Sequence, residues 1–214
     1  MKTGKVFIAM CSIILMILTN SFSQNCKSFN IDIDPQSSIS INGTSNVNSF
    51  LFEQKGVLVN NPISISFTDS PKYDLVKPIT LPIEVKRFEC DNKLMKTDFF
   101  KTLNVDNYPF LDITMTNLEL PANFNLKSKT TNGSVRVSIK LAGVVCKYKV
   151  PFIIAAKNEK LVIFGEKVVS FSDFNLEPPS KLLGIVKVDN NLRININLIV
   201  RYTQNQLNTE YTQK

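Results

Sequence analysis

The chain has 214 residues, of which 43% are hydrophobic and 20% charged, enough apolar material for the core of one domain. It contains no histidine, which excludes His-based metal sites, Ser-His-Asp and Cys-His nucleophilic schemes and histidine acid–base catalysis. The net charge of +7 is scattered along the sequence, so we expect no nucleic-acid partner; a transient contact with an anionic membrane surface is kept as an alternative.

The N-terminal stretch 1–23 has the pattern of a secretory signal peptide. A positive start precedes an apolar run, and Ser21 and Ser23 are small residues suited to cleavage after position 23. The run is shorter than a comfortable membrane span, although an uncleaved anchor is the alternative. We therefore predict an exported protein, periplasmic or secreted, with one domain over 24–202 and a polar tail over 203–214.

Short segments with alternating apolar and polar residues follow, and this pattern predicts β-strands with one dry face. Asn42-Gly43 and residues 60–62 are turn-forming and predict breaks between strands. In the first half of the domain the predicted strands cover residues 29–33, 39–41, 47–52, 57–59, 63–67 and 81–88.

One segment, residues 92–103, changes to helical periodicity. Its apolar residues recur every four positions, as at Met95 and Phe99, which places them on one face of a helix. Asp91 or Asn92 stands at the start and can cap the helix. We expect one helix here, inserted among the strands.

The strongest alternation lies in the second half of the domain. Apolar and polar residues alternate throughout 134–141, and the segment 192–202 repeats the pattern over a longer stretch. Asn132-Gly133 predicts a hairpin turn before the first of these segments, and Gly143 permits a sharp bend after it. The remaining predictions are strands at 110–118, 144–155 and 161–171, and a short helix or covering segment at 182–188.

These eight or nine strands, with one helix after about the fifth, lack the βαβ rhythm that a parallel sheet requires. The prediction is therefore an all-β fold, an antiparallel barrel or sandwich whose apolar side faces inward. The question for function is whether side chains fill that interior or whether it holds a ligand.

Residues able to carry chemistry are few, and no GxSxG, GxGxxG or P-loop motif occurs. Cys26, Cys90 and Cys146 lack zinc-site spacing, and they form either one disulfide plus a free thiol or plain buried positions. Asp32 and Asp34 share a strand face, where a bound cation is the minor alternative to solvated surface. We predict no catalytic residue, no metal and no cofactor, and hence no enzyme.

Four groups of residues carry a family resemblance. They are Gly43-Thr44-Ser45-Asn46-Val47 with Phe50, residues 94–100 followed by Tyr108-Pro109, residues 137–144, and residues 171–174 with Pro178-Pro179 and 183–185. In this order, and spanning about residues 39–202, they resemble the YceI-like family of lipid-binding proteins.

The resemblance implies an eight-stranded, antiparallel, lipocalin-like barrel with a helix covering one end. It also implies an elongated apolar interior that holds a long isoprenoid lipid or the tail of an isoprenoid quinone. The residues that we predict to line this interior are Val135, Val137, Ile139, Leu141, Ile194, Ile196 and Leu198, with Phe99 and Phe100 plugging or gating one mouth.

The alternative is an interaction module of the cell envelope. In that case the same residues are ordinary core, the barrel binds no lipid, and an exposed apolar patch docks a partner.

Overall fold

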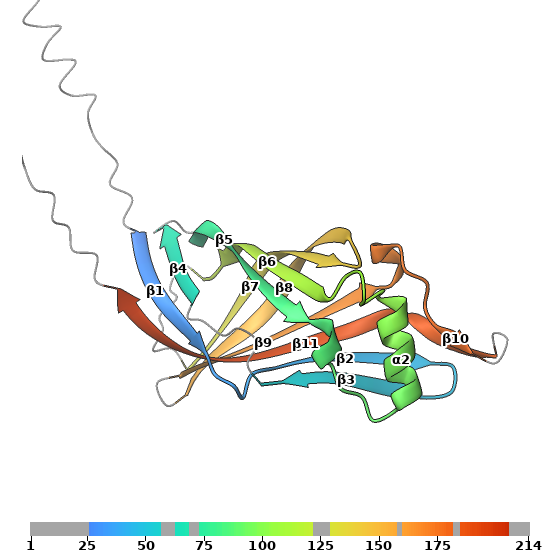
Figure 1. Cartoon of the computed structure of the whole chain (residues 1–214). Helices are drawn as coiled ribbons and strands as arrows, with labels where there is room; N and C mark the ends of the chain where they lie inside the picture. The colour runs from blue at the N-terminus through green and yellow to red at the C-terminus, as the bar shows by residue number, and fades with distance from the viewer. Residues whose placement is uncertain are drawn as a thin grey trace, which may run out of the picture.

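The computed structural model describes residues 26–56, 63–68, 73–121, 129–157, 160–181 and 185–205, and in these ranges the protein is a curled antiparallel sheet with one α-helix against it (Figure 1). The helix α2 spans Lys93–Thr102, and two short 3-10 turns are η1 (Val85–Arg87) and η2 (Ser172–Phe174). The strands are β1 (Cys26–Ile33), β2 (Ser38–Ser45), β3 (Ser49–Lys55), β4 (Ile63–Thr68), β5 (Tyr73–Glu84), β6 (Phe110–Glu119), β7 (Thr130–Leu141), β8 (Val144–Lys157), β9 (Lys160–Ser170), β10 (Ser180–Lys181) and β11 (Val186–Asn205).

Eight of these strands pair in a closed ring, in the order β11, β1, β4, β5, β6, β7, β8, β9 and back to β11. The long strand β11 makes this possible. Its C-terminal part pairs with β1, while its N-terminal part pairs with β2, which carries β3 on its other side. The predicted antiparallel eight-stranded barrel with one inserted helix is confirmed, and the described sheet has more strands than the eight or nine expected because β2, β3 and β10 extend the ring.

The hairpin of β7 and β8 shows most directly how the sequence produces the barrel wall. Val137, Ile139, Val150 and Phe152 alternate with polar residues and are buried on the inner face. The bend predicted near Gly143 is a tight turn in which the two central residues, Ala142 and Gly143, both have positive φ (48° and 83°). Such turns match the right-handed twist of the flanking strands.

Two predicted turns are wrong, because Asn42-Gly43 lies inside β2 and Asn132-Gly133 lies inside β7. In both strands the glycine makes room for an aromatic ring from the neighbouring strand. A Cβ at Gly43 would lie 2.1 Å from Cζ of Phe50, and a Cβ at Gly133 would lie 2.5 Å from Cζ of Phe152. In both strands the Asn-Gly pair therefore does not form a turn, and its glycine leaves space for a ring of the neighbouring strand.

Other boundaries shift for local reasons. The strand expected at 81–88 ends at Glu84, where the chain turns into η1. β11 is longer than expected and runs to Asn205, and it begins at Val186, inside the segment predicted as a helix or cover. The predictions at 57–59, 60–62 and 182–184 fall outside the described residues.

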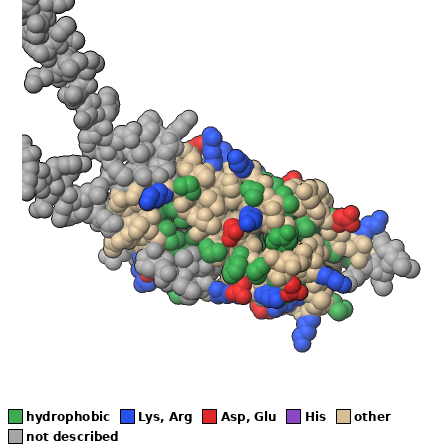
Figure 2. Space-filling model, turned by 45° about the horizontal axis from the view of Figure 1, so that its top comes forward, with side chains coloured by type: hydrophobic (Ala, Val, Ile, Leu, Met, Phe, Trp, Pro, Cys, Tyr) green, Lys and Arg blue, Asp and Glu red, His purple; other side chains and the backbone are tan. Residues whose placement is uncertain are grey.

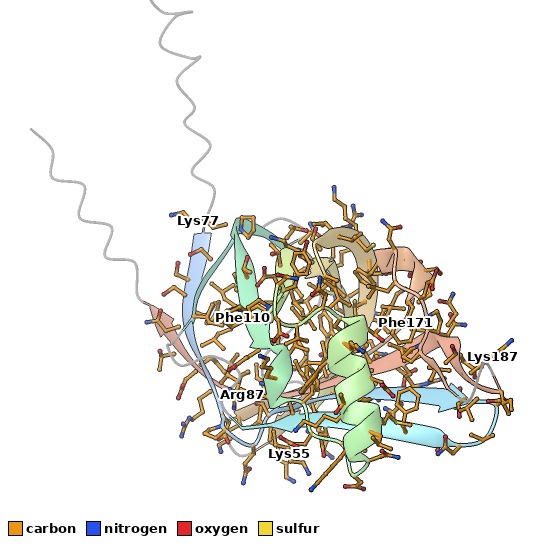
Figure 3. All side chains as sticks on the ribbon, turned by 45° about the vertical axis from the view of Figure 1, so that its right-hand side comes forward. Lys55, Lys77, Arg87, Phe110, Phe171 and Lys187 are labelled. Carbon is orange, nitrogen blue, oxygen red and sulfur yellow. The ribbon has the colours of Figure 1, made fainter. Side chains whose placement is uncertain are left out.

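The helix is confirmed close to its predicted bounds. Oδ1 of Asn92 accepts a hydrogen bond from the backbone N–H of Met95 at 3.1 Å, which caps the first turn as predicted. Figures 1 and 3 both show α2 lying across one end of the barrel, beside β2 and β3. We call this the helix end, and the opposite end, where β1 begins and β11 finishes, the terminal end.

The core runs the length of the barrel in two clusters. The larger cluster contains the buried face of α2 together with Phe52, Phe88 and Ile83, each at most 1% exposed. The smaller cluster, built around Phe152 and Val200, pairs residues of β1, β8, β9 and β11 toward the terminal end. Half-buried side chains belong to both clusters, so the apolar inner face continues from one cluster into the other.

The outer surface carries charges of both signs. Figure 2 shows basic and acidic side chains interspersed with hydrophobic ones over the face in view. Several are paired across strands, as in the contact of Arg201 Nη2 with Asp32 Oδ2 at 3.0 Å. Exposed pairs of this kind contribute little stability, typically below about 1 kcal/mol each.

Candidate ligand-binding site

The nine residues predicted to line the interior lie together in the larger core cluster. Val137, Ile139 and Phe99 are buried, at 5–6% exposure, and the other six are half-buried. Val135 and Leu198 also contact the smaller cluster, so this set extends from the helix end toward the terminal end. The structure thus brings the predicted residues together on the inner face, and their contact with a ligand stays a prediction.

Side chains leave little space at the helix end of this interior. The enclosed cavity found inside the helix end has a volume of only about 40 Å³, with an entirely apolar lining. Ligand pockets typically occupy roughly 300–1,000 Å³. The predicted residues Phe99, Ile139, Leu141 and Ile194 line this cavity, which is by itself too small for a long chain.

Phe99 occupies the helix end as a plug. Its ring stacks on Phe52 of β3 with centroids 4.1 Å apart and planes at 23°, and it meets the edge of Phe88 at 6.4 Å. Phe100 lies further out, with its ring 6.2 Å from that of Phe99 and 5.7 Å from the ammonium of Lys96. Both residues lie at the helix end, and their role in plugging or gating a mouth stays a prediction.

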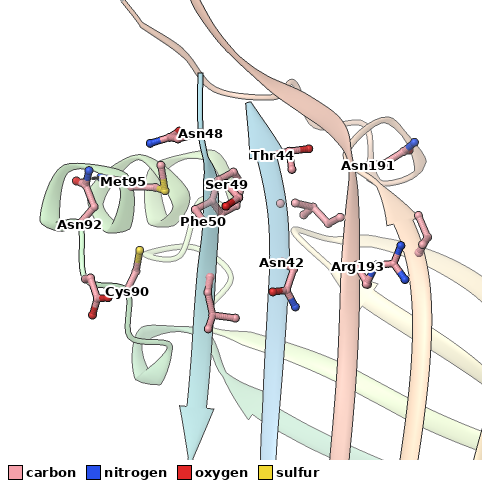
Figure 4. A pocket seen from close by; sticks show the side chains of 15 residues that line it. Asn42, Thr44, Asn48, Ser49, Phe50, Cys90, Asn92, Met95, Asn191 and Arg193 are labelled. Carbon is pink, nitrogen blue, oxygen red and sulfur yellow. Dashed lines mark hydrogen bonds between the residues drawn. The ribbon is translucent and has the colours of Figure 1, made fainter. Parts of the chain in front are cut away.

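A larger space, which we call the open pocket, lies outside this plug. It has a volume of about 580 Å³ and is bounded by β2, β3, β9, β11, the segment 90–92 and α2 (Figure 4). Phe50, Met95 and Leu192 form apolar parts of its lining. Its polar lining consists mainly of amides and hydroxyls, namely Asn42, Thr44, Asn48, Ser49, Asn92 and Asn191.

The open pocket is nearly neutral in charge. Arg193 lies in its lining, but Nη1 of Arg193 is 2.5 Å from Oε1 of Glu166. Asp91 adds a carboxylate on the side of α2. The sequence did not reveal this pocket, because Asn42-Gly43 was interpreted as a turn and the other lining residues come from distant segments.

Asp173 is the most strongly bonded carboxylate near the helix end. Oδ2 of Asp173 accepts hydrogen bonds from the Tyr148 hydroxyl at 2.8 Å and from the Ser170 N–H at 3.1 Å. Hydrogen bonds from Ser170 and Tyr148 lower the pKa of Asp173, whereas burial and the bond to Asp173 raise the pKa of Tyr148. These shifts keep the carboxylate charged and the phenol neutral, so the pair fixes η2 to β8 and offers no general base.

The two aspartates considered as a cation site, Asp32 and Asp34, each have a basic side chain as partner. Lys160 Nζ lies 2.7 Å from Asp34 Oδ2, and this hydrogen bond lowers the pKa of Asp34. Asp32 has its own partner in Arg201, so the two aspartates face separate cations. In the described ranges no group of three His, Cys, Asp or Glu side chains is placed to hold a metal ion.

The cysteines do not define a site. Cys90 and Cys146 are both free, and the side chain of Cys26 lies outside the described part of the chain. Cys146 Sγ donates to the backbone oxygen of Asp173 at 3.0 Å and packs on the inner face. Among the described residues, no helix is long and apolar enough to cross a membrane, and the predicted signal peptide lies outside them.

Comparison with known proteins identifies the fold. No family model and no curated protein matches the sequence. Among solved structures, BcnA of Burkholderia cenocepacia is 16% identical, with 78% of this chain and 99% of that chain covered and a TM-score of 0.50. A polyisoprenoid-binding domain from Saccharophagus degradans is 8% identical, with 82% and 98% covered and a TM-score of 0.53.

A YceI protein of Campylobacter jejuni also matches, at 14% identity, with 66% of this chain and 79% of that chain covered and a TM-score of 0.48. The resemblance predicted from the sequence is confirmed as a likeness of fold by BcnA and the polyisoprenoid-binding domain. At these identities the likeness extends to the barrel and its inserted helix and assigns no ligand.

Proposed function

We propose that this protein is a non-enzymatic binding protein that holds a long apolar lipid, either a polyisoprenoid or an isoprenoid quinone, inside the barrel. The observation that carries the proposal is the predominantly apolar inner face, which continues through both core clusters. The fold is shared with a domain that is named for polyisoprenoid binding, which supports the same ligand class.

Binding requires the interior to change, because the enclosed cavity of about 40 Å³ cannot hold such a chain. A prenyl tail would replace side-chain contacts with contacts of the same apolar kind. Each buried CH₂ of the tail contributes about 0.8 kcal/mol, so a long tail can offset the separation of several side chains. We therefore expect binding to be coupled to an opening of the barrel.

We also propose that the protein acts after export, guided by the signal peptide at residues 1–23. The support is the sequence pattern alone, a positive start, an apolar run and small residues before position 24. A transient contact with a membrane surface would give the protein access to its lipid.

Mass spectrometry of lipid extracted from protein purified from its native host tests the ligand class. We expect an isoprenoid lipid at a constant ratio to protein, and uptake of added geranylgeraniol by protein from which lipid has been removed. A consistently empty protein that takes up neither geranylgeraniol nor a prenyl quinone would overturn the proposal.

The small volume of the cavity at the helix end also favours a second candidate, an interaction module that binds no lipid. Ile153 of β8 and Phe164 of β9 lie opposite one another on the outer face and are 45% and 43% exposed. Contiguous exposed apolar patches mark docking surfaces, and this pair is the candidate centre of such a patch. In this case the lipid experiment gives an empty barrel, and the double variant Ile153→Ser/Phe164→Ser abolishes partner capture without loss of stability.

A further inference from the structure

The barrel wall at the helix end has little backbone pairing along the line where β3 faces α2 and the segment 88–92, which we call the β3–α2 seam. In the described residues β3 has a full ladder only with β2. Its other edge is joined to the chain before α2 at a single residue pair. The N–H of Glu53 donates to the carbonyl of Glu89, and the N–H of Glu89 to the carbonyl of Glu53, both at 2.9 Å.

The hairpin of β7 and β8 is closed, by contrast, by a long ladder. Its two strands are paired from Thr130–Ala155 at one end to Leu141–Val144 at the other. Opening the wall there would break many backbone hydrogen bonds and leave their groups unpaired in an apolar interior. Opening the β3–α2 seam breaks one pair of backbone bonds, and the remaining contacts across it are side-chain contacts.

Those side-chain contacts are apolar and replaceable. Phe52 of β3 stacks on Phe99 of α2, and Phe50 meets the edge of Phe52 with centroids 5.8 Å apart. Gly43 on β2 gives the ring of Phe50 its space, since a Cβ there would lie 2.1 Å from that ring. A hydrocarbon chain entering between these rings would exchange one set of apolar contacts for another.

The seam also separates the two spaces of the molecule. Met95 lines the open pocket, and Phe99, one helical turn further along α2, lines the enclosed apolar cavity. Leu192 lines both. Side chains alone therefore stand between a space of about 580 Å³ open to solvent and the apolar interior of the barrel.

We propose that an apolar ligand enters and leaves the barrel through the β3–α2 seam, with the open pocket as the outer mouth of this route. The inference rests on the proposed function and adds the path to it. Phe50, Phe52 and Phe99 are the side chains that move, and β3 is the wall strand that separates from α2.

A disulfide across the seam tests the route. Residues that exchange both backbone hydrogen bonds in an antiparallel pair have Cα atoms about 5.5 Å apart, within the range that a disulfide bridges. The variant Glu53→Cys/Glu89→Cys, in a background with Cys26, Cys90 and Cys146 replaced by serine, places this bond at the seam. Uptake of geranylgeraniol is followed by native mass spectrometry with the bond oxidised and after its reduction.

We expect oxidation to slow uptake at least tenfold and reduction to restore the rate. The matched control is Ser138→Cys/Lys147→Cys, which links directly opposite residues of β7 and β8, where the ladder already holds the wall. Oxidation of this control should leave uptake unchanged. Equal uptake by the oxidised and reduced seam variant would overturn the route while leaving lipid binding intact.

Failure of the proposed function gives a different result. If the reduced seam variant, the control and the unmodified protein all take up no geranylgeraniol while circular dichroism shows them folded, the proposed function is wrong and the route falls with it. If only the seam variant fails in its reduced form, the seam residues have a further role in binding, and the route as stated is overturned.

Discussion

The hairpin of β7 and β8 and the pair of β2 and β3 are built from the same kind of strand but closed in different ways. β7 and β8 have a continuous ladder, strict alternation and a tight turn, and both lie within the closed ring. β2 and β3 extend that ring at the helix end, and β3 meets the rest of the molecule through Glu89 and aromatic contacts. The first region fixes the shape of the barrel, and the second is where its shape can change.

The β2–β3 region also contains a buried polar side chain. Gln54 of β3 is 1% exposed, and its Oε1 has no hydrogen-bond partner. A buried acceptor without a partner costs about 1–3 kcal/mol. The buried acceptor of Gln54 therefore lowers the stability of the β2–β3 region. Regions of lower local stability are the ones that open most readily in a folded protein.

The largest expected effect is the loss of the contact that closes the seam. Phe52→Ala removes a ring that is 1% exposed and stacked on Phe99, so we expect the free energy of unfolding to fall by about 3–5 kcal/mol. Denaturant titration measures this. The neighbouring Leu51→Ala, at a position 47% exposed, should change it by less than about 0.5 kcal/mol. A small effect of Phe52→Ala would mean that the seam is not closed by this stack.

Substitution of the two strand glycines, Gly133 in β7 and Gly43 in β2, allows a direct comparison of the two regions. A Cβ at Gly133 meets both the Phe152 ring and, at 2.9 Å, the backbone oxygen of Glu119, so Gly133→Ala should cost about 2–3 kcal/mol. A Cβ at Gly43 meets only side chains, those of Phe50 and Leu192, and both border the open pocket. Gly43→Ala should therefore cost less, about 1 kcal/mol.

Thermal and denaturant unfolding of the two glycine variants, measured side by side, check this order. Equal losses would show that Phe50 is held as firmly as Phe152. The β2–β3 region would then be no more adaptable than the β7–β8 hairpin.

Replacing Gln54 should act in the opposite direction. Gln54→Met keeps the length of the side chain and removes the buried acceptor, so we expect a gain of about 1 kcal/mol in the free energy of unfolding. If the seam must open for binding, the same variant should take up geranylgeraniol more slowly. A loss of stability would show that Oε1 has a partner when the protein is in solution.

The sequence predicted the regular region better than the irregular one, for physical reasons. The alternation at 134–141 and 192–202 indicates which face of each strand is turned toward the core. The four-residue spacing of Met95 and Phe99, with Asn92 before them, indicates a capped helix. Alternation does not report how much volume the inward side chains fill. The small volume of the cavity at the helix end could therefore not be predicted from the pattern that placed Val137 and Ile139 inside.

The open pocket was hidden for a different reason. Its lining comes from six separate segments, and their approach depends on β11 pairing with β1 at one end and with β2 at the other. Asn42-Gly43, which lies in that lining, has the composition of a turn, and only the ring of Phe50 explains the glycine. Tertiary packing overrode the local signal at this position.

The smallest expected effect concerns the polar bond between η2 and the regular wall. Hydrogen bonds from Ser170 and Tyr148 hold the pKa of Asp173 below its ordinary value. A carboxylate with a lowered folded-state pKa contributes stability that is complete above its unfolded pKa and is lost as the pH falls through the folded-state value. Asp173→Asn should therefore lower the free energy of unfolding at pH 7 by less than about 1 kcal/mol, because Asp173 is exposed.

Once the pH has fallen below the lowered folded-state pKa of Asp173, the difference between Asp173→Asn and the unmodified protein should disappear, since both side chains are then uncharged. Glu89→Gln is the matched control at the seam, where the carboxylate is 73% exposed and paired with Lys96. Its effect should be smaller still, because an exposed ion pair contributes little and the backbone pairing with Glu53 remains. A larger loss for Glu89→Gln than for Asp173→Asn would reverse the comparison, since side-chain charge and not backbone pairing would then hold β3 to the chain before α2.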